Sequence, residues 1–165
     1  MEELALERWT DFAVVVGGAS AALTGLLFVA ISINIGAIGR SISLRSRGAQ
    51  TLVLFAVTLV VSILLSVPAQ PAAVLGGELV SLAVIAGGGL LTLDRRAKRE
   101  QDTPKLARTL DVVSPNAVTL LLTAAAGVVV ITGHAWGLYL LVPSTVIGIV
   151  GGLVNAWLFL TTLGE

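Results

Sequence analysis

The sequence predicts an all-α protein: a single domain, residues 1–165, built as a polytopic transmembrane bundle of five helices. The chain is 56% hydrophobic and only 12% charged, whereas soluble domains carry about 25% charged residues. Its apolar residues are collected in long runs, each close to the roughly 20 residues that a helix needs to cross the hydrocarbon core. The lipid bilayer is therefore the expected surroundings of this chain.

Five apolar runs define the predicted spans, at residues 9–35, 49–67, 71–93, 116–133 and 136–163. The first run follows an acidic start. The second and third are separated by the uncharged turn Ala69-Gln70 between two prolines, and the fourth and fifth by Gly133-His134-Ala135. The runs are apolar on all sides and do not alternate apolar with polar residues, so they indicate helices rather than barrel strands.

The distribution of charge predicts the orientation. Nine of the ten basic residues fall in the segments 36–48 and 94–111, which alternate with the two uncharged turns. Short basic loops stay on the cytoplasmic side of a membrane. We therefore expect the N-terminus outside and the C-terminus inside, in a cytoplasmic (inner) membrane. The preference for Arg over Lys, eight to two, together with abundant Ala, Gly, Val and Leu, is typical of a bacterial chain from a GC-rich genome.

Small residues at a spacing of four predict where helices approach each other, because they let two backbones come close. Gly17, Ala21 and Gly25 form one such ridge in the first span, and Gly148 and Gly152 form another in the fifth. The simplest interpretation is packing within one bundle. Five helices in a small bundle cannot bury every ridge, so self-association is also expected.

The candidate polar path consists of Glu78, Asn34, Asn155 and Ser62. Glu78 is the principal candidate, because a charge at the middle of a membrane helix costs on the order of 2–3 kcal/mol and intramembrane carboxylates often mark ion or proton paths. The structural alternative is that these side chains only form hydrogen bonds to neighbouring helices.

Enzymatic activity is not expected. The chain has no cysteine, and it contains neither a GxSxG nor an HExxH motif nor a phosphate-binding loop. His134 is the single histidine and makes a poor metal site alone, so neither a metal nor a cofactor is predicted. The ten basic and ten acidic residues cancel, which leaves no net field to attract nucleic acid.

Two resemblances are carried by the first part of the chain. Residues 18–30, 45–52 and 67–70 read GASAALTGLLFVA, RSRGAQTL and VPAQ, and together they resemble a family of small, uncharacterised bacterial integral membrane proteins, which implies no activity. The pattern Ser20-Ala21-x-Leu23-x-Gly25 followed by Val29-Ala30 is similar to the pore-lining first helix of Orai-type calcium channels. Ile33 stands where those channels carry their selectivity glutamate, so the resemblance does not extend to the carboxylate ring.

Two functions remain open from the sequence. The first is a homo-oligomeric channel or small transporter whose polar path includes Glu78. The second is a non-catalytic partner or regulatory subunit that binds another membrane protein through its glycine ridges or through the segment 94–111. The intramembrane acid favours the first.

Overall fold

The computed structural model describes residues 9–40, 42–98 and 114–161, and within these ranges it contains helices and turns but no strand. The elements are α2 (Thr10–Ile33), α3 (Ile35–Arg40), α4 (Ile42–Leu65), α5 (Ala72–Lys98), α7 (Pro115–Ile131), the 3₁₀ helix η2 (Ala135–Leu140) and α8 (Leu141–Thr161). The predicted all-helical fold is confirmed.

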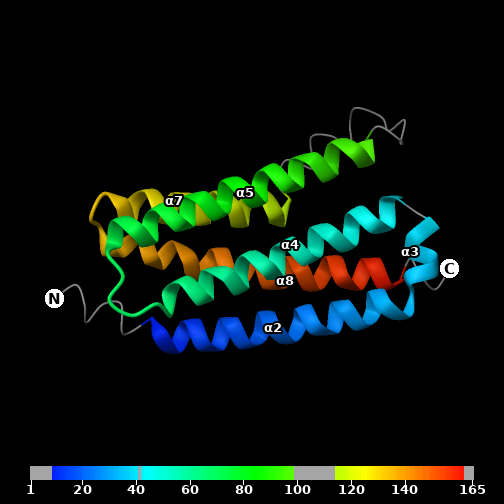
Figure 1. The fold of residues 1–165 in the computed structure, drawn as a ribbon, viewed down its shortest axis with the longest axis horizontal. Helices are drawn as coiled ribbons and strands as arrows, with labels where there is room; N and C mark the ends of the chain where they lie inside the picture. The colour runs from blue at the N-terminus through cyan, green and yellow to red at the C-terminus, as the bar shows by residue number, and fades with distance from the viewer. Residues whose placement is uncertain (1–8, 41, 99–113, 162–165) are drawn as a thin grey trace.

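The long helices lie roughly antiparallel along one axis (Figure 1). α4 is central and packs against α2, α5 and α8, while α7 packs against α5 and α8. The start of α2 and the end of α8 lie at opposite ends of the bundle (Figure 1). We call the end that holds the starts of α2 and α5 the first end, and the end that holds the start of α4 the second end.

Four segments are long and apolar enough to cross a membrane: Thr10–Ile33, Leu44–Leu65, Ala72–Leu93 and Ala135–Leu158. α7 is the shorter apolar helix, with 17 residues, or about 25 Å at the usual rise of 1.5 Å per residue. It nevertheless packs along α5 and α8 as part of the same bundle. Four described helices thus have the length and composition of membrane spans, and the count of five crossings stays a prediction, as does the orientation.

The connection between the first two spans differs from the prediction. Of the segment 36–48, expected as a loop, residues 36–40 belong to α3 and residues 42–48 form the first turns of α4. Charge marks where a chain leaves hydrocarbon, but it does not end a helix, and arginine is a good helix former. Arg45 and Arg47 are exposed on these turns. The last part of α5 likewise takes up residues 94–98, and the rest of the predicted basic loop, 99–111, lies outside the described residues.

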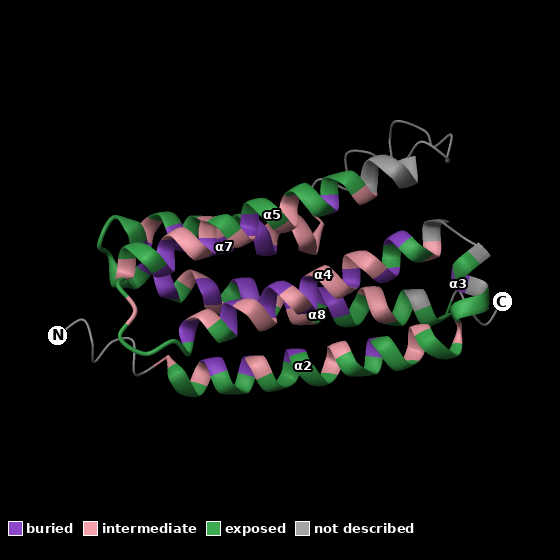
Figure 2. Ribbon diagram, in the orientation of Figure 1, coloured by how far each residue is buried: buried purple, intermediate pink, exposed green. Residues whose placement is uncertain are grey.

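Exposed positions run along every long helix (Figure 2), and the distribution of polarity between exposed and buried positions is the reverse of that in a soluble protein. Large apolar side chains face outward along every long helix, among them Val15 at 70% and Ile85 at 73% exposed. The buried set includes nine serines and threonines, such as Thr51, Thr58 and Thr123. Water would penalise so large an apolar surface, since soluble monomers expose patches of only a few hundred Å². Hydrocarbon accepts it, which supports a membrane as the solvent.

Hydroxyl groups connect α7 to α8 in the interior. The Thr123 and Ser144 hydroxyls are 2.8 Å apart, and the Ser144 hydroxyl also donates to the Thr119 carbonyl at 2.9 Å. At the start of α7 the Ser114 hydroxyl accepts a hydrogen bond from the Ala117 N–H, with Pro115 in the first turn. Serine before proline is a favourable helix start, so this helix begins where the local sequence directs it.

The closest helix contact joins α5 to α7 at two glycines. A Cβ atom added to Gly76 would stand 2.6 Å from the Gly127 carbonyl oxygen, and one added to Gly127 would stand 2.6 Å from the Gly76 carbonyl oxygen. Only glycine permits this approach, as in other membrane helix pairs. Gly76 and Gly127 belong to small-residue runs of the third and fourth predicted spans, but the sequence does not show that these two runs meet.

Candidate functional site

Glu78 lies in the second turn of α5, close to the turn that follows α4. It is six residues beyond Ala72, or about 9 Å into the span at 1.5 Å per residue. In the preceding turn Ala69 adopts a φ of 53°, a left-handed conformation that is uncommon for residues other than glycine. The turn brings Gln70 back over α5, where its Nε2 donates a hydrogen bond to the Glu78 Oε2. Gln70 is the partner that sequence reasoning missed.

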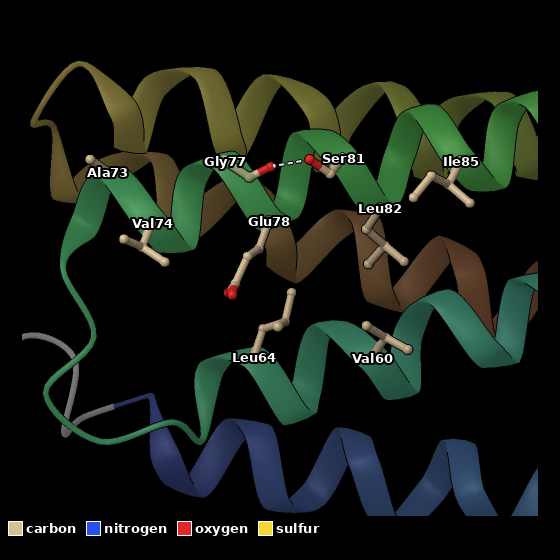
Figure 3. A pocket seen from close by; sticks show the side chains of 9 residues that line it. All are labelled: Val60, Leu64, Ala73, Val74, Gly77, Glu78, Ser81, Leu82 and Ile85. Carbon is tan, nitrogen blue, oxygen red and sulfur yellow. Dashed lines mark hydrogen bonds between the residues drawn. The ribbon is translucent and has the colours of Figure 1, made fainter.

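The Glu78 side chain enters a groove between α4 and α5 (Figure 3). Its carboxylate points away from α5 toward Leu64 of α4 (Figure 3). The groove has a volume of about 480 Å³ and is open on one side. Apart from Glu78, its lining consists of Val60, Leu64, Ala73, Val74, Gly77, Ser81, Leu82 and Ile85. Ser81 is the other polar side chain in this lining, and its hydroxyl donates to the Gly77 carbonyl at 2.8 Å. The groove is thus an apolar surface with one carboxylate.

Ser62 is near Glu78 along the bundle axis but faces a different helix. Its hydroxyl donates to the Ala13 carbonyl of α2. Leu64, two residues later, lines the Glu78 groove, and two residues correspond to about 200° of rotation around a helix. Ser62 therefore connects α2 to α4, on the opposite side of α4 from the carboxylate.

The two asparagines of the predicted polar path, Asn34 and Asn155, lie toward the second end of the bundle. Asn34 ends α2, where its side-chain Nδ2 donates to the Ala30 carbonyl at 3.0 Å. Asn155 is partly buried, 14 residues beyond the start of α8 at Leu141, or about 21 Å along that helix. Within one bundle the structure thus brings neither asparagine to Glu78, and the four candidate residues do not share one face.

The predicted ridge on α2 divides between two faces. A Cβ atom added to Gly17 would meet the Ser62 side chain of α4, whereas one added to Gly25 would have no atom within 4 Å, and Ala21 is exposed. Steps of four residues advance about 40° each around a helix, so Gly25 is about 80° away from Gly17. Gly18 and Gly25 instead belong to an outward face of α2.

The ridge on α8 lies inside the bundle. A Cβ atom on Gly148 would come 3.0 Å from the Thr58 hydroxyl of α4, and one on Gly152 would overlap the Phe55 ring of the same helix. These two glycines let α8 approach the central helix.

Chemically, the site offers a negative charge, a hydrogen-bonded amide and an apolar wall. Among the described residues no group of three His, Asp or Glu side chains lies together, so Glu78 acts alone as the charged group of its groove. Comparisons of the chain with family models, with curated proteins and with solved structures gave no match. The interpretation of the site therefore rests on its own geometry.

Proposed function

We propose that the protein is a homo-oligomeric channel or small transporter of a bacterial cytoplasmic membrane, and that its polar path passes Glu78 where neighbouring bundles meet. The supporting observation is the place of this carboxylate: partly buried, inside a span, beside a groove that opens to the side of the bundle. Hydrocarbon solvates a carboxylate poorly, and such groups normally face a protein interior or a watery cavity. A neighbouring copy of the bundle would enclose Glu78 and so provide such a protein interior or watery cavity.

The path is proposed between copies because most of the buried hydroxyls that the structure describes already have hydrogen-bond partners inside the bundle. The buried hydroxyls of Thr51, Thr58 and Thr145 donate to carbonyls of their own helices. Hydroxyls satisfied in this way do not line water, and apolar side chains such as Phe55 and Leu54 fill the remaining centre.

Flux through purified protein in liposomes tests this proposal. Glu78→Gln keeps the size of the side chain and removes its charge, so we expect it to change cation or proton flux by about tenfold or more, as loss of a buried charge does in other sites. The matched control is Asp11→Asn, which neutralises an exposed acid at the same end of the bundle outside the groove. Absence of flux under every imposed gradient, or equal effects of the two variants, would contradict the proposal.

The alternative is a non-catalytic partner subunit. The observation that favours it is the outward face of α2, where a Cβ atom added to Gly18 or Gly25 would meet no atom of the described residues within 4 Å, so this face could accept a helix of another membrane protein. This function predicts a distinct partner after purification in mild detergent and no effect of Glu78→Gln. Recovery of the protein with copies of itself alone would argue against it.

A further inference from the structure

We propose that the groove between α4 and α5 binds a lipophilic organic cation, with the charged centre of the ligand paired to Glu78 and its hydrocarbon arms against the groove wall. The inference rests on the proposed transport function and specifies the class of substrate.

The chemistry of the groove selects the ligand class. Glu78 Oε2 accepts a hydrogen bond from Gln70, and the other carboxylate oxygen has no partner among the described residues. The Gln70 Oε1 is buried and also lacks a described partner, so this pair has acceptor capacity left over. Ca²⁺ and Mg²⁺ take six or more oxygen ligands, and one carboxylate and one amide supply at most three. A quaternary ammonium needs only a negative group and apolar contact.

The wall and the volume agree with this class. Val60 and Leu64 of α4 face Leu82 and Ile85 of α5 across the groove (Figure 3), and they offer aliphatic contact to a hydrocarbon ligand. The volume of about 480 Å³ is within the 300–1,000 Å³ typical of small-molecule sites. Because the groove opens sideways, a ligand dissolved in the membrane could enter it directly.

Charge complementarity favours a cation over a lipid acyl chain as the occupant, and over side chains of a neighbouring copy as the charge partner of Glu78. The ionisable side chains that the structure describes at the first end are Asp11, Glu78, His134 and Tyr139, and none of them is a lysine or an arginine. Nine of the ten basic residues belong to the segments 36–48 and 94–111, and the start of α4 and the end of α5, which carry part of them, lie at the second end. A parallel copy would therefore bring few basic groups to Glu78, and an acyl chain would leave the carboxylate unpaired.

Direct binding of tetrabutylammonium and of tetraethylammonium to the full chain in detergent, measured by calorimetry, tests the inference without any flux. We expect tetrabutylammonium to bind about tenfold or more tightly than its shorter analogue, because each buried methylene favours binding by up to about fourfold. Glu78→Gln should weaken binding by about tenfold or more.

Two glycine variants keep the test valid if Glu78→Gln affects folding. Gly77 lines the groove and Gly88 lies further along α5, and a Cβ atom at either glycine meets no atom within 4 Å. Gly77→Leu should block tetrabutylammonium by filling the groove, whereas Gly88→Leu should leave its affinity within about twofold, as exposed substitutions usually do.

The outcomes separate this inference from the proposed function. Cation binding that depends on Glu78 and Gly77, without flux, would overturn the transport function and support the site. Flux that depends on Glu78, without binding of either cation, would overturn the site and support the function. Equal binding to the parent protein, Glu78→Gln and Gly77→Leu would identify partition into the micelle and overturn the site.

Discussion

Replacement of Gly76 by alanine should separate the two helices that approach most closely. The added Cβ atom would stand 2.6 Å from the Gly127 carbonyl oxygen and 2.9 Å from the Ile131 backbone nitrogen. Ordinary contact begins near 3.4 Å, so the missing separation from the oxygen is 3.4 − 2.6 = 0.8 Å. Both obstacles are backbone atoms of α7, so the strain cannot be relieved by a change of rotamer, and α5 must move away from α7.

The expected loss of stability is best expressed as the difference in unfolding free energy between Gly76→Ala and Gly88→Ala. Overpacking of a close contact costs about 1–3 kcal/mol. Alanine also gains about 0.5–1 kcal/mol over glycine in a helix, and Gly88→Ala shares this gain, because a Cβ atom at Gly88 meets no atom within 4 Å. The difference in unfolding free energy between Gly76→Ala and Gly88→Ala should therefore be about 1–3 kcal/mol, with Gly76→Ala the less stable.

Titration of the folded protein with sodium dodecyl sulphate, followed by circular dichroism, measures that difference. The same titration of Gly127→Ala should give a result close to that of Gly76→Ala, because its Cβ atom would meet the Gly76 carbonyl oxygen at the same distance of 2.6 Å. Equal stability of Gly76→Ala and Gly88→Ala would refute the close contact between α5 and α7.

Two further predictions concern other helix contacts. Thr123→Val and Ser144→Ala should show a coupling energy of about 0.6 kcal/mol in a double-mutant cycle of unfolding, the average for hydrogen bonds between membrane helices, because their hydroxyls are 2.8 Å apart. Gly17→Ala should lower the unfolding free energy, since its Cβ atom would meet Ser62. Gly25→Leu should preserve that free energy, because a Cβ atom at Gly25 meets no atom within 4 Å, and the same unfolding titration measures both variants.

Additive effects of Thr123→Val and Ser144→Ala would show that α7 and α8 are held together by shape alone. For α2, a loss of stability in Gly25→Leu as large as that in Gly17→Ala would place both glycines on the same packed face, against the division described above.

The sequence predicted the helices because an unsatisfied backbone polar group in hydrocarbon has a high free-energy cost. In hydrocarbon each backbone polar group must be satisfied within its own segment, so long apolar runs become helices. Their ends were less predictable. α4 begins at Ile42 rather than at residue 49, because Arg45 and Arg47 mark the limit of the apolar run and not the limit of the helix.

Helix faces could not be assigned from the same pattern. Nearly every position of a span is apolar, whether it faces lipid or a neighbouring helix, so hydrophobic periodicity carries little information. A Cβ atom added to Gly17 would meet Ser62, whereas one added to Gly25 would meet no atom of the described residues within 4 Å. The two glycines nevertheless look equivalent in the sequence. The contact between Gly76 and Gly127 requires knowledge of which helices are neighbours, and local sequence does not provide it.

For the site, Glu78 could be identified because a lone acid in an apolar run is conspicuous. The groove beside Glu78 and the hydrogen-bond partner Gln70 could not be predicted, because both depend on the left-handed turn at Ala69 and on which side of α4 faces α5. The available indication of this partner in the sequence was Gln70 itself, a polar residue eight positions before Glu78.

The membrane-spanning fold and its orientation can be tested directly by cysteine labelling, because the chain has no cysteine of its own. Ala69→Cys and Arg47→Cys place single thiols on exposed positions at the first and second ends. A membrane-impermeant maleimide should label Ala69→Cys on intact cells and Arg47→Cys only after permeabilisation. Labelling of both thiols from the same side, or release of the protein from membranes by alkaline carbonate, would contradict the account.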